Sequence, residues 1–487
     1  MKNLSRKSAN VTHVYPERIL QFGGGNFLRG FVDWIIDKYN RQSNDEKIGI
    51  LAVKVRKEGN YNQWAEQDGL YHLFSKGYMK GRTVDEMVLI KSVVRILEVH
   101  NEYDEFLKSA LNPQLNIIVS NTTETGLAFD SQDKADEIPS TFPGQLCRWL
   151  HARWTHFQND RSGKCVIIPC ELVDQNGQVL KNSIFEYINH WDLEDAFKLW
   201  LDERVQFCNS LVDRIVPGIN QDQLTKYQER TGFIDNMITE GEPYHLWAIE
   251  TKFDLAQLLP LDRIGLNVVY TKDLTPFKEQ KIKILNGAHT AMVPVGLLMG
   301  VQLVKDAVNH SALGPFIEKV VFEEITPSID IERETAEQFG QSVLDRFRNP
   351  FLEHKLQSIS MYSISKFNVR LKPTIKSYIV HNKTTPKGLM LSFAALLIFY
   401  KGDFNGKVYT ANDEAEKIEK LTQHWMKINT SGVISAVSIY EMLADEVLWE
   451  ENLNQISGFP EATAKYLKLI LEGKLDQVVT EIGSQSS

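Results

Sequence analysis

The chain has 487 residues, enough for two or three domains and for a large hydrophobic core without disulfides or metals. Hydrophobic residues make up 43% and charged residues 24%, which is typical of globular proteins and excludes a disordered or fibrous chain. The formal net charge is −9 and no Lys/Arg cluster stands out, so we expect no nucleic-acid partner.

The most apolar stretches, 291–301 and 388–400, are shorter than the ~18–20 residues that span a bilayer, so we expect no membrane segment. The first residues lack an apolar signal region, and the four cysteines lack C-x-x-C spacing. We therefore expect a cytoplasmic protein, and the sequence leaves monomer and homodimer as alternatives.

Residues 1–275 alternate short β-rich runs with amphipathic stretches, which predicts strand–helix–strand units and a doubly wound, Rossmann-like sheet. Phe27–Tyr39 is predicted to be a helix because apolar residues recur every three to four positions. The predicted strands are Arg18–Phe22, Gly49–Val55, Leu115–Ser120, Cys165–Pro169 and Leu266–Tyr270.

From Pro276 onward the pattern predicts almost only helices. They are Glu279–Val304, Ala312–Glu324, Asp330–Arg348, Gly388–Tyr400, Asp413–Asn429 and Ala462–Glu472. We therefore predict an α/β dinucleotide-binding domain over residues 1–275 and a mostly α-helical substrate and catalytic domain over residues 276–487.

A glycine-rich turn follows the first predicted strand, with Gly23, Gly24 and Gly25 before a helix. Glycines let the backbone approach a pyrophosphate, and the helix offers its N-terminal amides to the negative charge. The third glycine of G-x-G-x-x-G is replaced by Leu28, so an ordinary turn is the alternative. Because no G-K-[ST] follows, a Walker-type phosphate loop is disfavoured.

Two loops beyond predicted strands add candidates for this site. Glu58 could accept hydrogen bonds from an adenosine ribose, or it could be a solvated loop carboxylate. Arg56 and Lys57 beside it would suit the 2′-phosphate of NADP, so NADP stays an alternative to NAD. Thr123 and Glu124 follow the strand Leu115–Ser120 at the edge where ligands bind in such sheets.

A polar helix face opens the predicted helical domain. Lys281, Asn286 and His289 lie within an arc of about 140° on an α-helix, whereas Lys283 lies about 200° from Lys281. Each polar group would need a buried partner in a core, so the face suits either a cleft or solvent.

The segment from Val205 to Pro217 fits the pattern hydrophobic-x-F-x-x-small-x-V-D-R-I-x-P at every defined position. With this motif the chain resembles the mannitol dehydrogenase family of long-chain polyol dehydrogenases over nearly its whole length. Three further family motifs are present. The motif G-x-G-x-F-x-R is met by Gly23, Gly25, Phe27 and Arg29, and K-x4-N-x2-H is met by Lys281, Asn286 and His289. The motif S-K-F-x-x-R-x-x-P is met by Ser365, Lys366, Phe367, Arg370 and Pro373.

The resemblance implies reversible hydride transfer, without metal, between NAD and an open-chain sugar acid. Lys281 would be the general acid/base, Asn286 would donate to the carbonyl oxygen, and His289 would bind hydroxyls and orient the lysine. Lys366 and Arg370 would position the substrate, unless they form a surface or structural pair. The cofactor would contact Gly23, Gly25, Asn26, Phe27, Arg29, Glu58 and Thr123.

One departure from the family pattern bears on the substrate. Mannitol and fructuronate enzymes usually carry C-D-N-x-x-x-N-G, but Leu172 stands at the first Asn. Either Asn286 acts alone or Asn176 compensates as a substrate ligand, unless Asn176 forms an Asn-Gly turn. The departure argues against mannitol as substrate.

Other stretches narrow the expectation within the family. They are Tyr15–Arg29, Phe31–Trp34, Ser120–Glu124, Ile167–Leu172 and Asn286–Thr290. Through them the chain most resembles the family members that act on tagaturonate, and this resemblance implies reduction of tagaturonate to altronate with NADH. A fructuronate, mannonate or polyol dehydrogenase is the first alternative, and a catalytically silent nucleotide-binding regulator is the second. We expect Asp213 and Arg214 to form an ion pair that braces the two domains.

Overall fold

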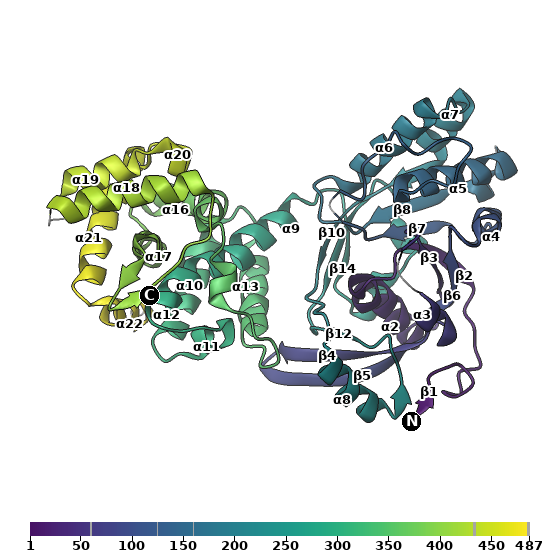
Figure 1. Cartoon of the computed structure of the whole chain (residues 1–487), viewed down its shortest axis with the longest axis horizontal. Coiled ribbons are helices and arrows are strands. Elements are labelled where there is room, and N and C mark those ends of the chain that lie inside the picture. Colours follow the sequence, from purple (N-terminus) through teal and green to yellow (C-terminus); the bar gives the residue numbers. More distant parts are fainter. Residues whose placement is uncertain (59–60, 124, 159, 432–434, 485–487) are drawn as a thin grey trace. The chain divides into compact units, whose positions relative to one another are not determined.

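The computed structural model describes residues 1–58, 61–123, 125–158, 160–431 and 435–484, without the side chains of residues 429–431. The chain divides into two compact units (Figure 1). Unit 1 contains Met1–Lys76 and Val84–Leu274, and unit 2 contains Gly77–Thr83 and Thr275–Ser487. No motif in the sequence indicated that Gly77–Thr83 groups with unit 2.

A six-stranded, fully parallel sheet organises unit 1. Its strands, in spatial order, are β6 (Val93–Glu98), β3 (Gly49–Lys54), β2 (Glu17–Phe22), β7 (Ile117–Ser120), β8 (Cys165–Pro169) and β9 (Val205–Phe207). Numbered by their order along the chain, these strands run 3-2-1-4-5-6, the order of a doubly wound dinucleotide-binding sheet. The predicted fold class is confirmed for this unit.

Both faces of this sheet are covered, which explains why its central strands are continuous apolar runs. Successive residues point to opposite faces, so Ile50 and Ala52 of β3 join one apolar cluster while Leu51 and Val53 join the other. The first cluster includes residues of α2, and the second includes residues of α4 to α7. The strand ends therefore form an open edge between the two helical layers.

Helices of unit 1 alternate with the strands as predicted, and Figure 1 shows α5, α6 and α7 together above the sheet. Their bounds are α1 Asn26–Leu28, η1 Arg29–Asp33 (a π-helix), α2 Trp34–Gln42, α3 Asn62–Glu66, α4 Tyr103–Ser109, α5 Phe142–Phe157, α6 Asn176–His190, α7 Asp195–Arg204 and α8 Gln221–Thr231. The short 3₁₀ turns are η2 Arg161–Gly163, η3 Leu255–Gln257 and η4 Leu261–Ile264.

Smaller sheets complete unit 1. The predicted strand Leu266–Tyr270 appears as β14, but in a separate three-stranded sheet rather than in the parallel one. The long hairpin strands β4 and β5 were not predicted at all. These sheets combine β10 (Asn209–Asp213), β13 (Leu246–Glu250) and β14 (Val268–Thr271); β12 (Thr239–Gly241), β4 (Tyr71–Met79) and β5 (Arg82–Ile90); and β1 (Lys2–Asn3) with β11 (Phe233–Ile234).

Unit 2 is built around α17 (Lys387–Lys401), whose residues from Gly388 to Tyr400 are all buried. A helix that is apolar on every side belongs in a core, and α10, α18 and α21 pack around it. The remaining elements are α9 Thr275–Glu279, η5 Gln280–Asn286, α10 Gly287–Leu298, α11 Val304–Asn309, α12 Leu313–Lys319, η6 Val320–Ile325, η7 Thr326–Ser328, α13 Arg333–Phe347, α14 Leu356–Ile359, α15 Ser363–Lys366, η8 Phe367–Leu371, α16 Lys372–Asn382, β15 Asp403–Phe404, β16 Lys407–Val408, α18 Ala415–Ser431, α19 Ala436–Leu443, α20 Glu446–Trp449, η9 Leu453–Gln455, α21 Phe459–Leu471 and α22 Leu475–Ser484.

The first predicted helix of this unit is not one α-helix. Glu279–Val304 contains the π-helix η5, continues as α10 and ends at Leu298. The hairpin tip Gly77–Thr83 joins this unit because the Lys80 backbone N–H donates to Asp345 Oδ2 of α13 at 2.7 Å.

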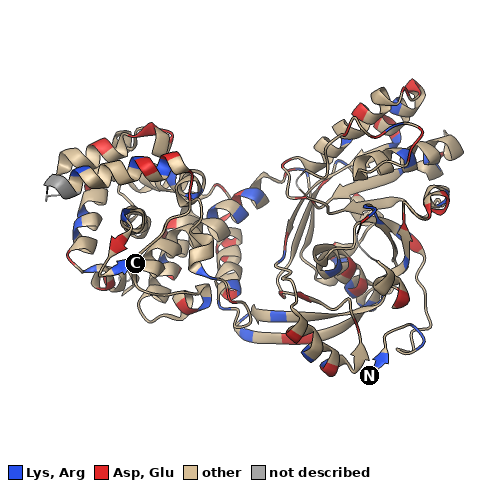
Figure 2. Cartoon of the chain, viewed as in Figure 1, with Lys and Arg blue, Asp and Glu red and all other residues tan. Residues whose placement is uncertain are grey.

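Charged residues of both signs are interspersed along the helices in Figure 2. Within the part of the chain that the structure describes, no helix is both long enough and apolar enough to cross a membrane.

Candidate functional site

The three glycines after β2 serve three different purposes. Gly23 has a φ of +108°, a conformation that disfavours any side chain. A Cβ on Gly24 would lie 2.5 Å from the Trp64 ring, so this glycine is required by packing. At Gly25 no heavy atom of the described residues lies within 4 Å of a would-be Cβ, and the residue is exposed. The turn therefore presents open backbone at Gly25, as close approach by a dinucleotide requires.

Arg29 holds this turn in shape rather than extending from it. Only 8% of Arg29 is exposed, and its guanidinium donates to Gly24 O at 2.5 Å, Asn26 Oδ1 at 2.6 Å and Thr239 Oγ1 at 3.0 Å. Asn26 is exposed, while the half-buried Phe27 ring stacks on Phe31 with centroids 5.0 Å apart. These contacts make Arg29 a residue that positions the glycine turn.

Asp33 is a buried acid that is linked to Arg29 through Tyr71. Asp33 is fully buried, and the Tyr71 hydroxyl lies within hydrogen-bonding distance of Asp33 Oδ2, at 3.0 Å, and of Arg29 O, at 2.8 Å. Burial raises the pKa of Asp33 to about 7, against the opposing effect of its hydrogen bond with Tyr71.

The other predicted cofactor residues lie on exposed loops of unit 1. Glu58 is exposed after β3, and Thr123 is exposed after β7, with its Oγ1 3.3 Å from Thr125 Oγ1. Glu124 lies outside the described residues. The loop beyond β7 is tied to β8 through Glu171, whose carboxylate accepts from Thr122 N at 2.9 Å and Ser120 Oγ at 3.1 Å.

Asn176 does not have a free amide for a substrate. It is 1% exposed; its Nδ2 donates to the carbonyls of Pro169, Glu171 and Ser210, and its Oδ1 accepts from Gly177 N and Ser210 N. The predicted Asn-Gly turn is also wrong, because Gln175 adopts the left-handed conformation and Asn176 begins α6. Leu172, at the family Asn position, is 67% exposed. We therefore withdraw Asn176 as a substrate ligand.

The expected brace between Asp213 and Arg214 is wrong as well. The Arg214 guanidinium lies over the Trp34 ring at 3.8 Å and donates to the carbonyls of Glu242 and Gly30. All three partners belong to unit 1, so this arginine stabilises that unit internally.

The polar face of unit 2 owes its geometry to a π-helix. Lys281 and Asn286 both lie in η5, where the i to i+5 hydrogen-bond pattern brings residues five apart closer to one face than an α-helix does. The 140° arc expected on an α-helix is therefore too wide for this pair. Both residues are half-buried, and Lys283 pairs with Glu279 at 2.9 Å. The Asn286 side-chain amide makes no hydrogen bond to another described residue.

His289, one turn further on, is surrounded by rings and cations. Its ring centroid lies 4.2 Å from that of Phe347 and 5.2 Å from that of His354. Its Nε2 is buried without a hydrogen-bond partner among the described residues. Burial, followed by the charges of the neighbouring groups His354, Arg346, Arg370 and Lys366, lowers the pKa of His289 well below its usual range. The ring is therefore neutral at neutral pH.

Lys366 and Arg370 come to this face from a second segment, at the junction of α15 and η8. Arg370 donates to Thr290 Oγ1 at 3.2 Å, and Thr290 Oγ1 donates to Asn286 O at 2.7 Å. Burial lowers the pKa of Arg370 and, together with Arg370, that of Lys366. The structure thus brings together Asn286, His289 and the two cations that spacing alone could not place.

Two members of this cluster were not predicted. His354 precedes α14, and the 6%-exposed Arg346 lies in the last turn of α13. No spacing relates them to Lys281. Arg346 is brought to this region by the packing of α13 against η5, and His354 by the packing of α14 against α10. No element was predicted between Arg348 and Gly388, so no pattern in the sequence placed His354.

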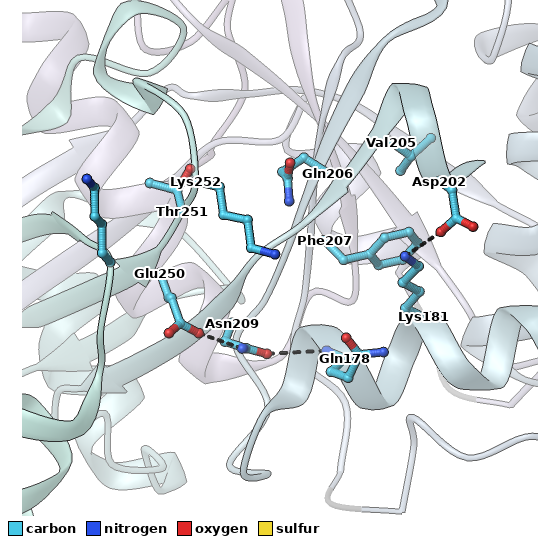
Figure 3. A pocket seen from close by; sticks show the side chains of 11 residues that line it. Gln178, Lys181, Asp202, Val205, Gln206, Phe207, Asn209, Glu250, Thr251 and Lys252 are labelled. Atoms are coloured by element: carbon cyan, nitrogen blue, oxygen red, sulfur yellow. Dashed lines mark hydrogen bonds and ion pairs between the residues drawn. The ribbon is translucent and has the colours of Figure 1, made fainter. Parts of the chain in front are cut away.

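Unit 1 also contains a polar cavity of about 600 Å³ that no predicted site residue lines (Figure 3). Lys181 pairs with Asp202 at 2.6 Å, and Asn209 Nδ2 donates to Glu250 at 2.6 Å. The lining residues are Gln178, Lys181, Asp202, Val205, Gln206, Phe207, Asn209, Glu250, Thr251, Lys252 and Lys272. The charge of Lys181 is therefore compensated within the cavity wall.

Comparisons with known proteins agree on one family. Residues 17–262 match the mannitol dehydrogenase Rossmann domain, and residues 273–471 match the mannitol dehydrogenase C-terminal domain. Altronate oxidoreductase from Escherichia coli O7:K1 (strain IAI39) is 39% identical over 481 residues, covering 98% of this chain and 99% of the relative. The altronate oxidoreductase of Shigella flexneri serotype 5b has the same identity and coverage.

Two solved structures share the fold. A substrate-free D-sorbitol dehydrogenase superposes with a TM-score of 0.76 at 21% identity, covering 96% of this chain and 95% of the other. Mannitol 2-dehydrogenase of Pseudomonas fluorescens, solved as a ternary complex with NAD and D-mannitol, gives 0.63 at 21% identity with both chains fully covered. The chain belongs to the mannitol dehydrogenase family of oxidoreductases.

Proposed function

We propose that this protein is an NAD-dependent oxidoreductase that reversibly reduces tagaturonate to altronate. The observation that carries the proposal is the polar face of unit 2, where an amide and an imidazole with unused hydrogen-bonding groups adjoin Lys366 and Arg370. Full-length relatives at 39% identity named altronate oxidoreductase support this choice of substrate.

The cofactor would bind in unit 1, at the glycine turn and the open edge of the parallel sheet. Gly23 and Gly25 would let the backbone approach the pyrophosphate, Arg29 would hold the turn through Gly24 and Asn26, and Phe27 would support it from the first helical turn. Glu58 would accept hydrogen bonds from the adenosine ribose, and Thr123 would border the site from the loop after β7. A bound nicotinamide would supply or accept the hydride.

Unit 2 would carry the proton chemistry. As hydride adds to the ketone carbon, the Lys281 ammonium gives a proton to the developing alkoxide; in the reverse direction the amine takes it from the alcohol. The Asn286 amide donates to the same oxygen, where negative charge accumulates. His289, neutral because burial lowers its pKa, binds a substrate hydroxyl, while Lys366 and Arg370 attract the carboxylate.

The decisive experiment compares two lysines of the same helix segment. Lys281→Ala should lower kcat/KM for tagaturonate by about 10²- to 10⁴-fold, the usual contribution of a general acid/base, with an unchanged melting temperature. Lys283→Ala, which removes a residue paired with Glu279, should retain nearly full activity. A Lys281→Ala protein that turns over at the original rate would remove the lysine from the mechanism.

Substrate identity is tested separately. kcat/KM should be highest for tagaturonate with NADH, compared with fructuronate and fructose and with NADPH in place of NADH. Greater efficiency with fructuronate or a neutral ketose would replace the substrate assignment. NADH binding without turnover of any of them would favour a regulator.

A further inference from the structure

The orientation of the His289 ring is set by packing. Its Nε2 is buried without a hydrogen-bond partner among the described residues. The ring lies against Phe347, with centroids 4.2 Å apart and planes inclined by 33°, and His354 meets it edge to face at 5.2 Å. Phe347 is buried and is the last residue of α13. Because buried rings are closely packed, a shift of this helix end would change the position of the imidazole.

The end of α13 needs support from outside the helix. The last turn of any helix leaves backbone carbonyls without intrahelical partners, and helix ends fray. Asp345 lies in this turn and adds a negative charge where the helix dipole is already negative, which is unfavourable. The side chain is nevertheless buried, so its carboxylate requires hydrogen-bond donors from neighbouring segments.

The turn of the β4–β5 hairpin supplies one of these donors. The Lys80 backbone N–H donates to Asp345 Oδ2 at 2.7 Å. Two further contacts of the carboxylate are longer, 3.2 Å to Gln341 Nε2 and 3.8 Å to Arg348 Nη1. Lys80 and Gly81 both have positive φ, 54° or less for neither of the flanking strands but +51° and +77° for the turn itself, as a two-residue type I′ turn requires. Because this turn type fixes the backbone, it also fixes the direction of the Lys80 N–H.

Asp345 and Phe347 lie on opposite sides of the same helical turn. At about 100° per residue, two positions along an α-helix differ by about 200°. The hairpin turn therefore contacts one side of the end of α13, and the His289 ring contacts the other. All of these residues belong to unit 2. The last turn of α13 thus lies between the hairpin turn and the imidazole.

We propose that the Lys80–Gly81 turn and Asp345 are positioning residues that fix the end of α13 and, through Phe347, hold the His289 imidazole where it meets a substrate hydroxyl. This inference rests on the proposed function for the role of His289 in substrate binding. It assigns a role to the β4–β5 hairpin, which lies outside the family motifs from which the sites were predicted. Loss of the hydrogen bond between Lys80 and Asp345 should therefore impair substrate binding more than the chemical step.

The kinetic test removes the acceptor of this hydrogen bond. Asp345→Ala should raise KM for tagaturonate about tenfold and leave kcat within about twofold, the pattern expected when ground-state binding is lost. Asp345→Asn retains a carbonyl oxygen for the Lys80 N–H and should keep KM within about twofold of the wild-type value. Gln341→Ala, the matched control, removes only another donor to the same carboxylate and should leave KM unchanged. Equal KM values for the alanine and asparagine variants of Asp345 would contradict the role of this hydrogen bond.

Gly81→Val tests the hairpin without altering α13. A β-branched residue disfavours the φ of +77° at this position, whereas no heavy atom of the described residues lies within 4 Å of a would-be Cβ. The substitution therefore acts through the conformation of the turn alone, and it should raise KM as Asp345→Ala does. Melting temperatures identify a variant that fails to fold, and the other variant then decides alone.

Two further measurements distinguish positioning from general stability. In a His289→Ala background, Asp345→Ala should change kcat/KM by less than about twofold, because the ring that it positions is absent. In full-length protein labelled with ¹³C-histidine, the His289 Cε1–H resonance should shift in Asp345→Ala and in Gly81→Val, since this ring lies against Phe347. The resonance of His151, from α5 in unit 1, should not change. Additive effects in the first measurement, or an unchanged His289 resonance in both variants, would overturn the inference.

The outcomes separate this inference from the proposed reaction. If the wild-type protein reduces tagaturonate but the variants change neither KM nor the His289 resonance, the positioning role is wrong and the function stands. If the resonance shifts in both variants but the wild-type protein does not reduce tagaturonate, the reaction is wrong and the hairpin still positions the ring. An inactive protein whose His289 resonance does not shift in either variant would refute both.

Discussion

Two arginines near the two predicted sites differ in how their donors are used. Arg29 in unit 1 is buried and gives hydrogen bonds to Gly24, Asn26 and Thr239, all parts of its own unit. Arg370 in unit 2 is half-buried and gives one, to Thr290. Each residue is a defined position of a family motif, so the sequence alone does not distinguish their roles, yet their environments differ.

The contrast separates residues that shape a site from residues that meet a ligand. When a buried guanidinium makes its hydrogen bonds within the protein, these bonds offset the unfavourable free energy of its desolvation. A partly exposed cation with unused donors keeps those donors available to a ligand. By this criterion Arg29 is a positioning residue, and we propose that Arg370, with His289, contacts the substrate.

The largest expected effect comes from exchanging each arginine for alanine. Arg29→Ala should lower the free energy of unfolding by about 3 kcal/mol, because three buried acceptors lose their donor. Arg370→Ala should change it by less than about 1 kcal/mol but lower kcat/KM for tagaturonate by roughly tenfold or more. Urea unfolding and steady-state kinetics measure the two effects. Equal losses of stability would contradict the distinction.

Gly24 and Gly25 allow the same distinction, between a residue that shapes the site and one that contacts a ligand, to be tested within one turn. Gly24→Ala should destabilise the protein by about 1–3 kcal/mol, because its Cβ would overlap the Trp64 and Tyr61 rings. Gly25→Ala should leave stability within about 0.5 kcal/mol, since its φ of −68° suits alanine and its surroundings are open. NADH affinity should nevertheless fall about tenfold in Gly25→Ala, measured by fluorescence titration. Unchanged NADH affinity would place the cofactor elsewhere.

The smallest effect, expressed per pH unit, concerns Asp33, the buried acid that is hydrogen-bonded to Tyr71. Because burial raises the pKa of Asp33 from 3.8 to about 7, the folded protein holds an extra proton between these values and loses stability as pH rises through them. Asp33→Asn should therefore flatten the pH dependence of the unfolding free energy by about 1 kcal/mol per pH unit in this window. Urea unfolding at pH 5, 6 and 8 measures it. Parallel curves for both proteins would show that Asp33 is ionised throughout.

Local patterns in the sequence were sufficient for much of unit 1. Short, continuous apolar runs located β2, β3, β7 and β8, because strands buried on both faces need apolar residues at nearly every position. The hairpin strands β4 and β5 escaped prediction, since β5 is mostly exposed and carries polar residues. The separate sheet of β14 escaped because strand pairing partners are distant in the chain.

Motif spacing identified Lys281, Asn286 and His289 as one group, because a helix of any type keeps such neighbours on adjacent turns. The sequence by itself thus determined the family, the fold class and the core of the polar face. Tertiary structure alone decided that Lys281 and Asn286 lie on a π-helix and that the Asn176 side chain is fully hydrogen-bonded to the backbone. It also decided that the His354 ring contacts His289 and that the charge of Arg346 acts on it. Whether a helix is of the α or the π type depends on its packing. The approach of Arg346 and His354 to His289, some 60 positions apart in the chain, depends on how α13 packs on η5 and α14 on α10. Local spacing encodes neither of these.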